Sequence, residues 1–226
     1  LNRASRYFPL VGWLIGFICA SVFLLAHGLL PLMPALLISM LVSVLLTGCF
    51  HEDGLADTCD GLGGAFETEK KLLIMKDSRL GTYGATSLWF VLSLKLALLL
   101  SLAQVGGAEV AALALVLAHP LSRMVSILLM TTMSYVTDPE GAKVKPVAQS
   151  LLKQDAIVII LTGAAALLLV PAVALWLIVF LVIFYWAYRR FLLAQIGGYS
   201  GDTLGAAQQL SELLIYTVLL AQVSAL

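Results

Sequence analysis

Charged side chains are scarce in this chain: Asp, Glu, Lys and Arg make up 12% of its 226 residues, whereas hydrophobic residues make up 61%. The mean hydropathy is +1.02. So few polar side chains cannot cover a water-soluble globule of this length, which indicates an integral membrane protein. The 13 basic and 13 acidic residues give a formal net charge of zero. Because nucleic-acid binding requires an excess of Lys and Arg on one face, no nucleic-acid partner is expected.

Cysteine is also rare, with three residues, Cys19, Cys49 and Cys59. An odd number of cysteines in or beside apolar segments implies no disulfide framework, and a cysteine metal cage is not expected. The chain starts at Leu1, and its first apolar run lacks an A-x-A-type cleavage site. We therefore expect a further N-terminal segment before Leu1 rather than a processed signal peptide.

Long apolar runs fill most of the chain, and a helix needs about 20 such residues to cross a bilayer. Residues 8–27 and 31–50 predict one helical hairpin, and residues 86–104 and 108–133 predict a second. The run 156–188 is too long for one span, and Pro171 near its middle predicts a division into two short spans. A last run covers 204–226. The prediction is a single all-α domain over 1–226, a polytopic membrane bundle of about seven transmembrane helices.

The basic residues are distributed unevenly along the chain. In a seven-span topology, the segments that carry most of them lie on one side, and the connections on the other side contain no Lys or Arg. Positively charged loops mark the cytoplasmic side, so the N-terminus and the connection 51–85 are predicted to be cytoplasmic. Eleven of the thirteen basic residues lie in these segments: Arg3, Arg6, Lys70, Lys71, Lys76, Arg79, Lys143, Lys145, Lys153, Arg189 and Arg190.

The connection 51–85 begins with HEDGLADTCDGLGG, which has four carboxylates and four glycines in fourteen residues. If this segment is helical, Asp53, Asp57 and Asp60 fall within about 60° on one face. A divalent cation would relieve their repulsion, and Mg²⁺ prefers a few carboxylates together with phosphate oxygens. We expect Gly61, Gly63 and Gly64 to let the backbone turn and approach a ligand. The motif suits a pyrophosphate substrate bound through Mg²⁺; the alternative is a solvated acidic helix end.

Residues 67–81, in the second part of the same connection, predict a short amphipathic cytoplasmic helix that rests on the membrane or the bundle and ends at Gly81. Arg79 either binds phosphate or complements the dipole of this helix, and Asp77 either binds metal or holds Arg79. The later connection 134–155 contains Asp-Pro-Glu-Gly, a turn signal. It is either a mobile lid or a solvated loop.

Three charged residues lie in the interior of the apolar runs, away from their ends: Lys95, Arg123 and Glu212. A buried base in a span requires a counter-charge or a watery cavity, so Lys95 and Arg123 either bind phosphate or form internal ion pairs, for which Glu212 is the natural partner. The His119-Pro120 pair suggests a kink that opens a cavity. Asp202, at the start of the last run, is expected to be a helix N-cap, a substrate ligand or both. In a regular helix His51 points away from the three aspartates.

Three separated segments, HEDGLADTCDGLGG, MKDSRLGTYG and GYSGDTLGAAQQLSE, closely resemble in order and spacing those of the cobalamin 5′-phosphate synthase family, also called adenosylcobinamide-GDP ribazoletransferase. The resemblance implies a multi-pass enzyme of the bacterial or archaeal inner membrane. It implies that the enzyme uses Mg²⁺ and joins α-ribazole or its 5′-phosphate to adenosylcobinamide-GDP, releasing GMP. One departure is Glu52, which stands where that family commonly has Leu.

The resemblance implies that Asp53, Asp57 and Asp60 are catalytic and hold the Mg²⁺. Asp57 is the candidate proton acceptor because it lies in the middle of the cluster. The motif positions and the two intramembrane bases together form the set of candidate substrate-binding residues. These are His51, Gly61, Gly63, Gly64, Asp77, Ser78, Arg79, Lys95, Arg123, Asp202 and Thr203. The sequence leaves open whether the chain forms a homo-oligomer.

Two other functions were weighed against this one. A CDP-alcohol phosphotransferase shares the start of the acidic motif, Asp57-x-x-Asp60-Gly61, but Gly64-Ala65 replaces its Ala-Arg and no G-x3-D-x3-D follows. A small transporter would use the intramembrane charges as its translocation site. A transporter does not need three aspartates on one face of a cytoplasmic connection, and no inverted repeat is evident.

Overall fold

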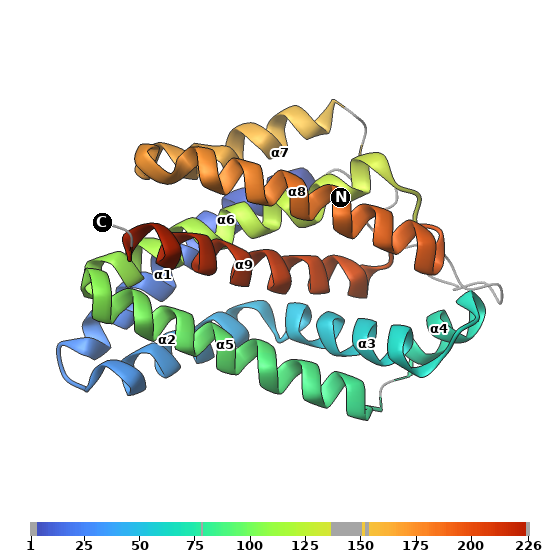
Figure 1. Ribbon diagram of the computed structural model, residues 1–226, viewed down its shortest axis with the longest axis horizontal. Helices are drawn as coiled ribbons and strands as arrows, with labels where there is room; N and C mark the ends of the chain where they lie inside the picture. Colours follow the sequence, from blue (N-terminus) through green and yellow to red (C-terminus); the bar gives the residue numbers. More distant parts are fainter. Residues whose placement is uncertain (1–3, 78, 137–150, 152–153, 225–226) are drawn as a thin grey trace.

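The computed structural model describes residues 4–77, 79–136, 151 and 154–224. Over these residues the chain is an elongated bundle of nine α-helices and two short 3-10 helices without strands, which confirms the predicted fold class (Figure 1). In chain order the elements are η1 (Ala4–Tyr7), α1 (Phe8–His27), α2 (Leu32–Thr47), α3 (Phe50–Gly64), α4 (Thr68–Met75), α5 (Thr82–Gly106), α6 (Ala108–Thr132), α7 (Asp155–Ala164), η2 (Ala165–Leu169), α8 (Pro171–Ile196) and α9 (Gly201–Val223).

Five stretches of the described chain are long and apolar enough to cross a membrane: α5, α6, α8, α9 and η1 with α1. Counting the bent pair α2 and α3 as one span raises the number to six, so the expected count of about seven is not confirmed. The run 156–188 does break at Pro171, which starts α8. However, the break leaves a 26-residue helix on one side and the short Asp155–Leu169 on the other. At about 1.5 Å per residue, the shorter piece falls below the 30 Å of a hydrocarbon core.

The predicted span 31–50 also ends early, because the chain bends by 84° between α2 and α3. Gly48 and Cys49 have φ of 63°, a left-handed conformation that stops α2 after Thr47. The acidic motif then forms α3, which packs against α9 and α5. His51, Glu52 and Asp60 are buried in these contacts. The start of the connection 51–85 is therefore part of the helix bundle and not a surface loop.

Glycines allow two pairs of helices to approach closely. A Cβ atom on Gly12 of α1 would lie 2.6 Å from the carbonyl oxygen of His119 in α6, and one on Gly16 would lie 3.1 Å from that of Leu115. Where α3 crosses the start of α9, a Cβ on Gly54 would lie 2.8 Å from the carbonyl oxygen of Asp202. Small residues permit such backbone contact in membrane bundles. This crossing fixes the position of the acidic motif relative to α9.

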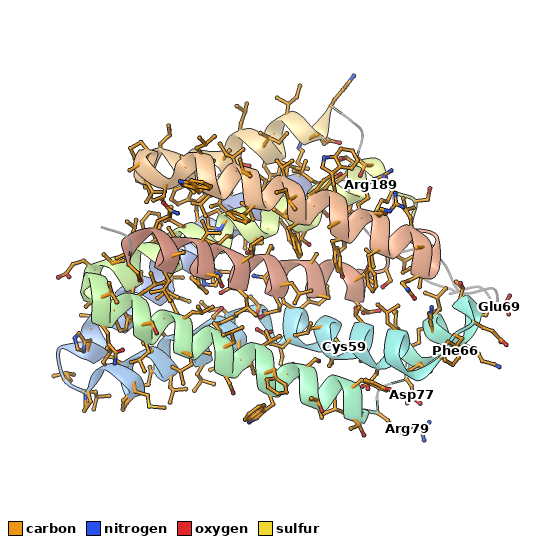
Figure 2. All side chains as sticks on the ribbon, in the orientation of Figure 1. Cys59, Phe66, Glu69, Asp77, Arg79 and Arg189 are labelled. Carbon is orange, nitrogen blue, oxygen red and sulfur yellow. The ribbon has the colours of Figure 1, made fainter. Side chains whose placement is uncertain are left out.

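The basic segments that the structure describes lie toward one end of the bundle. In Figure 1 α4 is at the right-hand end, and in Figure 2 Arg189 of α8 lies in the same half of the molecule. Lys71 of α4 donates a hydrogen bond of 2.6 Å to the Gln195 side chain of α8, and Arg6 forms a 3.1 Å ion pair with Asp155. This grouping agrees with the charge pattern. Lys143, Lys145 and Lys153, and most of the expected lid over 134–155, lie outside the described residues.

The short amphipathic helix is present as α4, but it ends at Met75 rather than at Gly81. Gly81 instead precedes α5 as its N-cap residue. The prediction was wrong at this boundary because Gly81 accepts the extended conformation, with φ of −93°, that an N-cap requires.

Candidate active site

An acidic group forms where α3 meets the start of α9. Asp53 is exposed and Asp57 is half-buried, and the side chain of neither forms a hydrogen bond or salt bridge with another described residue. Gly54 brings the backbone of Asp202 against α3. Asp57 thereby experiences the negative charges of Asp53, Asp202 and Asp60. The sequence predicted three acids from one helix, and the structure adds a carboxylate from α9, whose approach depends on the Gly54 contact.

Asp60 faces a different set of partners. Its Oδ2 accepts a 2.7 Å hydrogen bond from the backbone N–H of Gly81, and its Oδ1 accepts one of 2.8 Å from that of Gly84. Both donors belong to the first turn of α5, so Asp60 caps that helix from α3. A Cβ on either glycine would overlap the carboxylate. Asp60 thus ties α3 to α5, a role that the sequence did not predict.

Within the described chain, no three His, Cys, Asp or Glu side chains converge as a ready-made metal cage. Mg²⁺ does not need such a cage, because it commonly takes one or two carboxylates and completes its shell with water and substrate phosphate. Asp53 and Asp57, two like charges one helical turn apart, have this donor chemistry. The acidic group therefore fits Mg²⁺ held together with a phosphorylated ligand.

The glycines at the end of the motif serve helix packing. The expected turn at Gly61, Gly63 and Gly64 is absent, because α3 continues through Gly64. A Cβ on Gly61 would lie 2.8 Å from the carbonyl oxygen of Lys71, and one on Gly63 would lie 2.7 Å from the ring of Tyr83. The absence of a side chain at these positions allows α4 and α5 to pack against α3.

Asp77 and Arg79 lie on the connection before α5, at the same end of the molecule as Glu69 (Figure 2). Arg79 donates from Nε to both carboxylate oxygens of Asp77 at 3.0 Å. The guanidinium lowers the pKa of Asp77 by hydrogen bonding. Of the two alternatives, Asp77 therefore holds Arg79. Arg79 lies beyond the end of α4, so it does not cap that helix, and Ser78 lies outside the described residues.

The start of α9 is capped by Ser200, so Asp202 does not have the N-cap role, one of the two roles that the sequence suggested for it. The Ser200 hydroxyl accepts a 3.2 Å hydrogen bond from the Thr203 N–H, and the Thr203 hydroxyl accepts one of 2.9 Å from the Ser200 N–H. This reciprocal capping box gives Thr203 a structural role. Asp202 lies in the first helical turn, where its charge is favourable and its carboxylate can face Asp53 and Asp57.

Deeper in the bundle, Lys95 of α5 forms an internal ion pair, one of the two alternatives that the sequence left open. Its Nζ lies 3.2 Å from Glu212 Oε2 and donates a 2.9 Å hydrogen bond to Gln209 Oε1. Gln209 in turn donates at 2.9 Å to Oε1 of Glu52, whose Oε2 is buried without a partner among the described residues. The acid at position 52 is thereby linked to α9. Sequence reasoning missed Gln208 and Gln209, although two adjacent amides in an apolar run are a detectable signal of buried hydrogen bonding.

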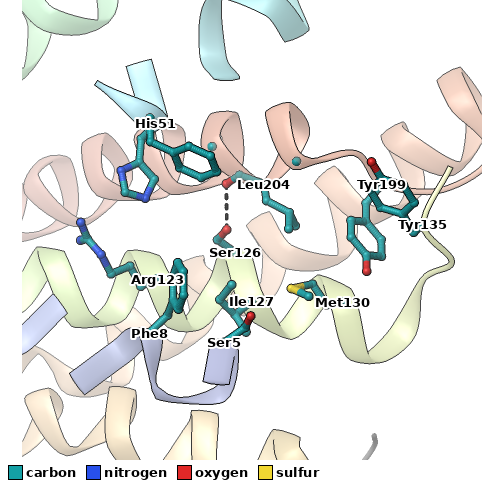
Figure 3. Close-up of a pocket in the computed structure, with 13 residues that line it drawn as sticks. Ser5, Phe8, His51, Arg123, Ser126, Ile127, Met130, Tyr135, Tyr199 and Leu204 are labelled. Carbon is teal, nitrogen blue, oxygen red and sulfur yellow. Dashed lines mark hydrogen bonds between the residues drawn. The ribbon is translucent and has the colours of Figure 1, made fainter. Parts of the chain in front are cut away.

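Arg123 lies in a different environment, at one end of a cavity of about 280 Å³. Its Nη1 contacts Nδ1 and the carbonyl oxygen of His119, each at 3.1 Å. The structure places the imidazole of His51 at the same end, and Tyr135 and Tyr199 at the other (Figure 3). His51 therefore faces this cavity, in agreement with its predicted orientation away from the aspartates.

Comparison with known proteins places the chain among relatives with assigned names. Residues 1–220 match the family model described as cobalamin-5-phosphate synthase. The adenosylcobinamide-GDP ribazoletransferase of Shewanella frigidimarina is 52% identical, over 98% of this chain and 85% of the relative. Those of Shewanella amazonensis and Shewanella oneidensis are each 48% identical, over 97% of this chain and 85% or 84% of the relative. No solved structure matches the chain.

Proposed function

The chain belongs to the cobalamin-5-phosphate synthase family, and from this premise we propose that it joins α-ribazole or its 5′-phosphate to adenosylcobinamide-GDP and releases GMP. It is a transferase of cobalamin biosynthesis and has membrane-spanning helices. The donor, the acceptor and the metal ion are our proposal. The observation that carries them is the acidic group at the crossing of α3 and α9, in which the carboxylates of Asp53 and Asp57 form no salt bridge with a described residue.

We propose Asp53 and Asp57 as the ligands of Mg²⁺, with Asp202 as the third nearby carboxylate. Both oxygens of Asp60 already accept backbone hydrogen bonds, so Asp60 is assigned to holding α5. When bound, Mg²⁺ would neutralise charge on the pyrophosphate of the donor and on the departing phosphate. The buried crossing at Gly54 holds the two contributing helices in a fixed relation, which keeps the carboxylates positioned for this task.

The proposed transfer forms one P–O bond and breaks another. The 3′-hydroxyl of the ribazole attacks the phosphorus attached to the cobinamide, and the bond from this phosphorus to the oxygen of GMP breaks. The hydroxyl proton passes to a nearby carboxylate, for which we propose Asp57 because it lies in the middle of the acidic group. We propose that this end of the bundle faces the cytoplasm, in accord with the clustering of basic residues.

The direct test is GMP release by the purified, folded protein supplied with adenosylcobinamide-GDP, ribazole phosphate and Mg²⁺. Release that stops when the metal is chelated supports the proposal, and no release above the chelated control refutes it. Asp57→Asn should lower kcat by at least 100-fold, because it removes a metal ligand and the proton acceptor. The matched control is Glu109→Gln at the first turn of α6, which removes an exposed carboxylate remote from α3 and should retain activity. Near-normal turnover by Asp57→Asn would reject its assignment.

Two of the three charges that a transporter would use, Lys95 and Glu212, form an ion pair with each other, which favours a structural role for both. Family membership likewise separates the chain from the CDP-alcohol phosphotransferases.

A further inference from the structure

The two bases inside the membrane-spanning helices differ in how they are neutralised. Lys95 is ion-paired with Glu212, whereas Arg123 has no salt bridge with any described residue. Glu212 and Glu52 act on Arg123 through longer-range electrostatics alone. The Nη1 of Arg123 forms hydrogen bonds with His119, but neither its Nε nor its Nη2 has a hydrogen-bond partner among the described residues. The side chain is nevertheless 2% exposed.

Such an arrangement is costly without a further ligand. The guanidinium stays protonated under all ordinary conditions, and a buried charge in a membrane span requires a counter-charge or water. Arginine also offers its remaining donors as a planar fork, which matches the oxygens of a phosphate. The inner end of the cavity is therefore suited to an anion.

The rest of the cavity is apolar and aromatic. It follows α6 from Arg123 to Met130, a stretch of eight residues that covers about 10 Å along the helix axis. Phe8, Phe50 and Leu204 are among the other lining residues. These walls suit a flat, weakly polar body attached to the anion, because pockets for small molecules combine apolar walls with a few placed polar groups.

At the outer end, the rings of Tyr135 and Tyr199 meet edge to face with centroids 5.6 Å apart. The cavity is also lined by residues of both helices that supply the carboxylates, His51 of α3 and Gly201 of α9. The carboxylates of Asp53, Asp57 and Asp202 do not line it. A ligand in the cavity therefore lies against both helices that supply the carboxylates.

We propose that this cavity binds the acceptor substrate in its phosphorylated form, a nucleoside monophosphate with an aromatic base. The phosphate lies at Arg123 and His51, and the base lies along the apolar walls. This inference rests on the proposed function and deepens it, because it assigns a separate site to the acceptor and assigns Arg123 to the phosphate of that acceptor.

The test measures GMP release with each of the two acceptors in turn, using the complete enzyme in lipid vesicles. Arg123→Met should lower the ratio of kcat/KM for the phosphorylated acceptor to that for the unphosphorylated acceptor by about 10- to 100-fold, through KM, because one or two charge-assisted hydrogen bonds are lost. Arg123→Lys keeps the charge without the fork and should give an intermediate ratio. The matched control, Arg190→Met, removes an exposed arginine on α8 and should leave the ratio at its wild-type value.

A cavity-filling variant tests the second half of the proposal without touching the charge. Ile127→Phe should raise KM for both acceptors by a similar factor, because Ile127 lines the cavity and the larger ring takes space from the shared nucleoside body. This variant also keeps the test open if Arg123→Met does not fold.

A ratio that is unchanged in folded Arg123→Met or Arg123→Lys, or KM values unaffected by Ile127→Phe, would overturn the proposal. Lipid headgroups carry the same phosphate chemistry, so binding of short-chain phosphatidic acid is measured in parallel. Arg123-dependent binding of the lipid but not of ribazole phosphate would also overturn it. If the wild-type enzyme released no GMP with either acceptor, the proposed function itself would fail.

Discussion

The tie between Asp60 and the first turn of α5 provides a sharp test of what the acidic motif does. In Asp60→Asn, the amide keeps one acceptor oxygen but turns an NH₂ group toward the other backbone N–H. The change removes one charge-assisted hydrogen bond, worth about 1.5–3 kcal/mol, and leaves a buried donor unsatisfied. Loss of the negative charge at the N-terminus of α5 adds about 0.3–1 kcal/mol. We therefore expect a loss of about 2–4 kcal/mol in stability.

The measurement is thermal unfolding in detergent together with hydrogen exchange of the backbone amides. For soluble domains of this size, a loss of about 2–4 kcal/mol lowers Tm by roughly 4–16 °C. The amides of Gly81 and Gly84, which donate to Asp60, should exchange faster in the variant. Asp57→Asn is the matched control on the same helix. It removes a repelling charge without breaking a hydrogen bond to another described residue, so its Tm should stay the same or rise.

Two results would refute this reasoning. An Asp60→Asn protein with wild-type Tm and wild-type exchange at Gly81 and Gly84 would show that the tie contributes no stability. A variant of normal stability that has lost its magnesium-dependent turnover would return Asp60 to the metal-ligand role that the sequence suggested.

Two further variants test the bundle itself. Lys95→Met should lower the free energy of unfolding by about 3–5 kcal/mol, because it leaves the buried carboxylate of Glu212 without its ion partner. Denaturant titration should show that the double variant with Glu212→Gln recovers much of this loss. No recovery would contradict the pairing. Gly12→Ala should lower the free energy of unfolding by about 1–3 kcal/mol, because the new Cβ would overlap the carbonyl of His119. In Gly28→Ala the nearest atom lies 3.4 Å from the new Cβ, so its stability should be within about 0.5 kcal/mol of wild type. Equal Tm values for the two glycine variants would contradict the close approach of α1 and α6.

Much of the fold was predictable because it depends on local properties of the chain. Apolar runs must lie in lipid as helices, since only internal hydrogen bonding satisfies a backbone there. The break at Pro171 follows from the missing N–H of proline. The number of spans was not predictable in the same way. It depends on the left-handed turn at Gly48 and Cys49, which ends a helix inside the apolar run 31–50 that hydropathy alone predicts to be one span.

The sequence by itself determined that this is a membrane protein with its acids concentrated beside the bilayer, and its motifs pointed to a pyrophosphate substrate. Tertiary structure alone decided which carboxylates have partners. Asp60 and Asp57 look equivalent on a helical wheel, yet Asp60 accepts hydrogen bonds from the backbone of α5, whereas Asp57 is affected by the negative charge of Asp202 of α9. In the same way, Lys95 is paired and Arg123 is not. The physical reason is that helical phase depends on neighbours in the chain, whereas neutralisation of a buried charge depends on groups on other helices, 21 residues away for Asp60 and Gly81 and 117 residues away for Lys95 and Glu212.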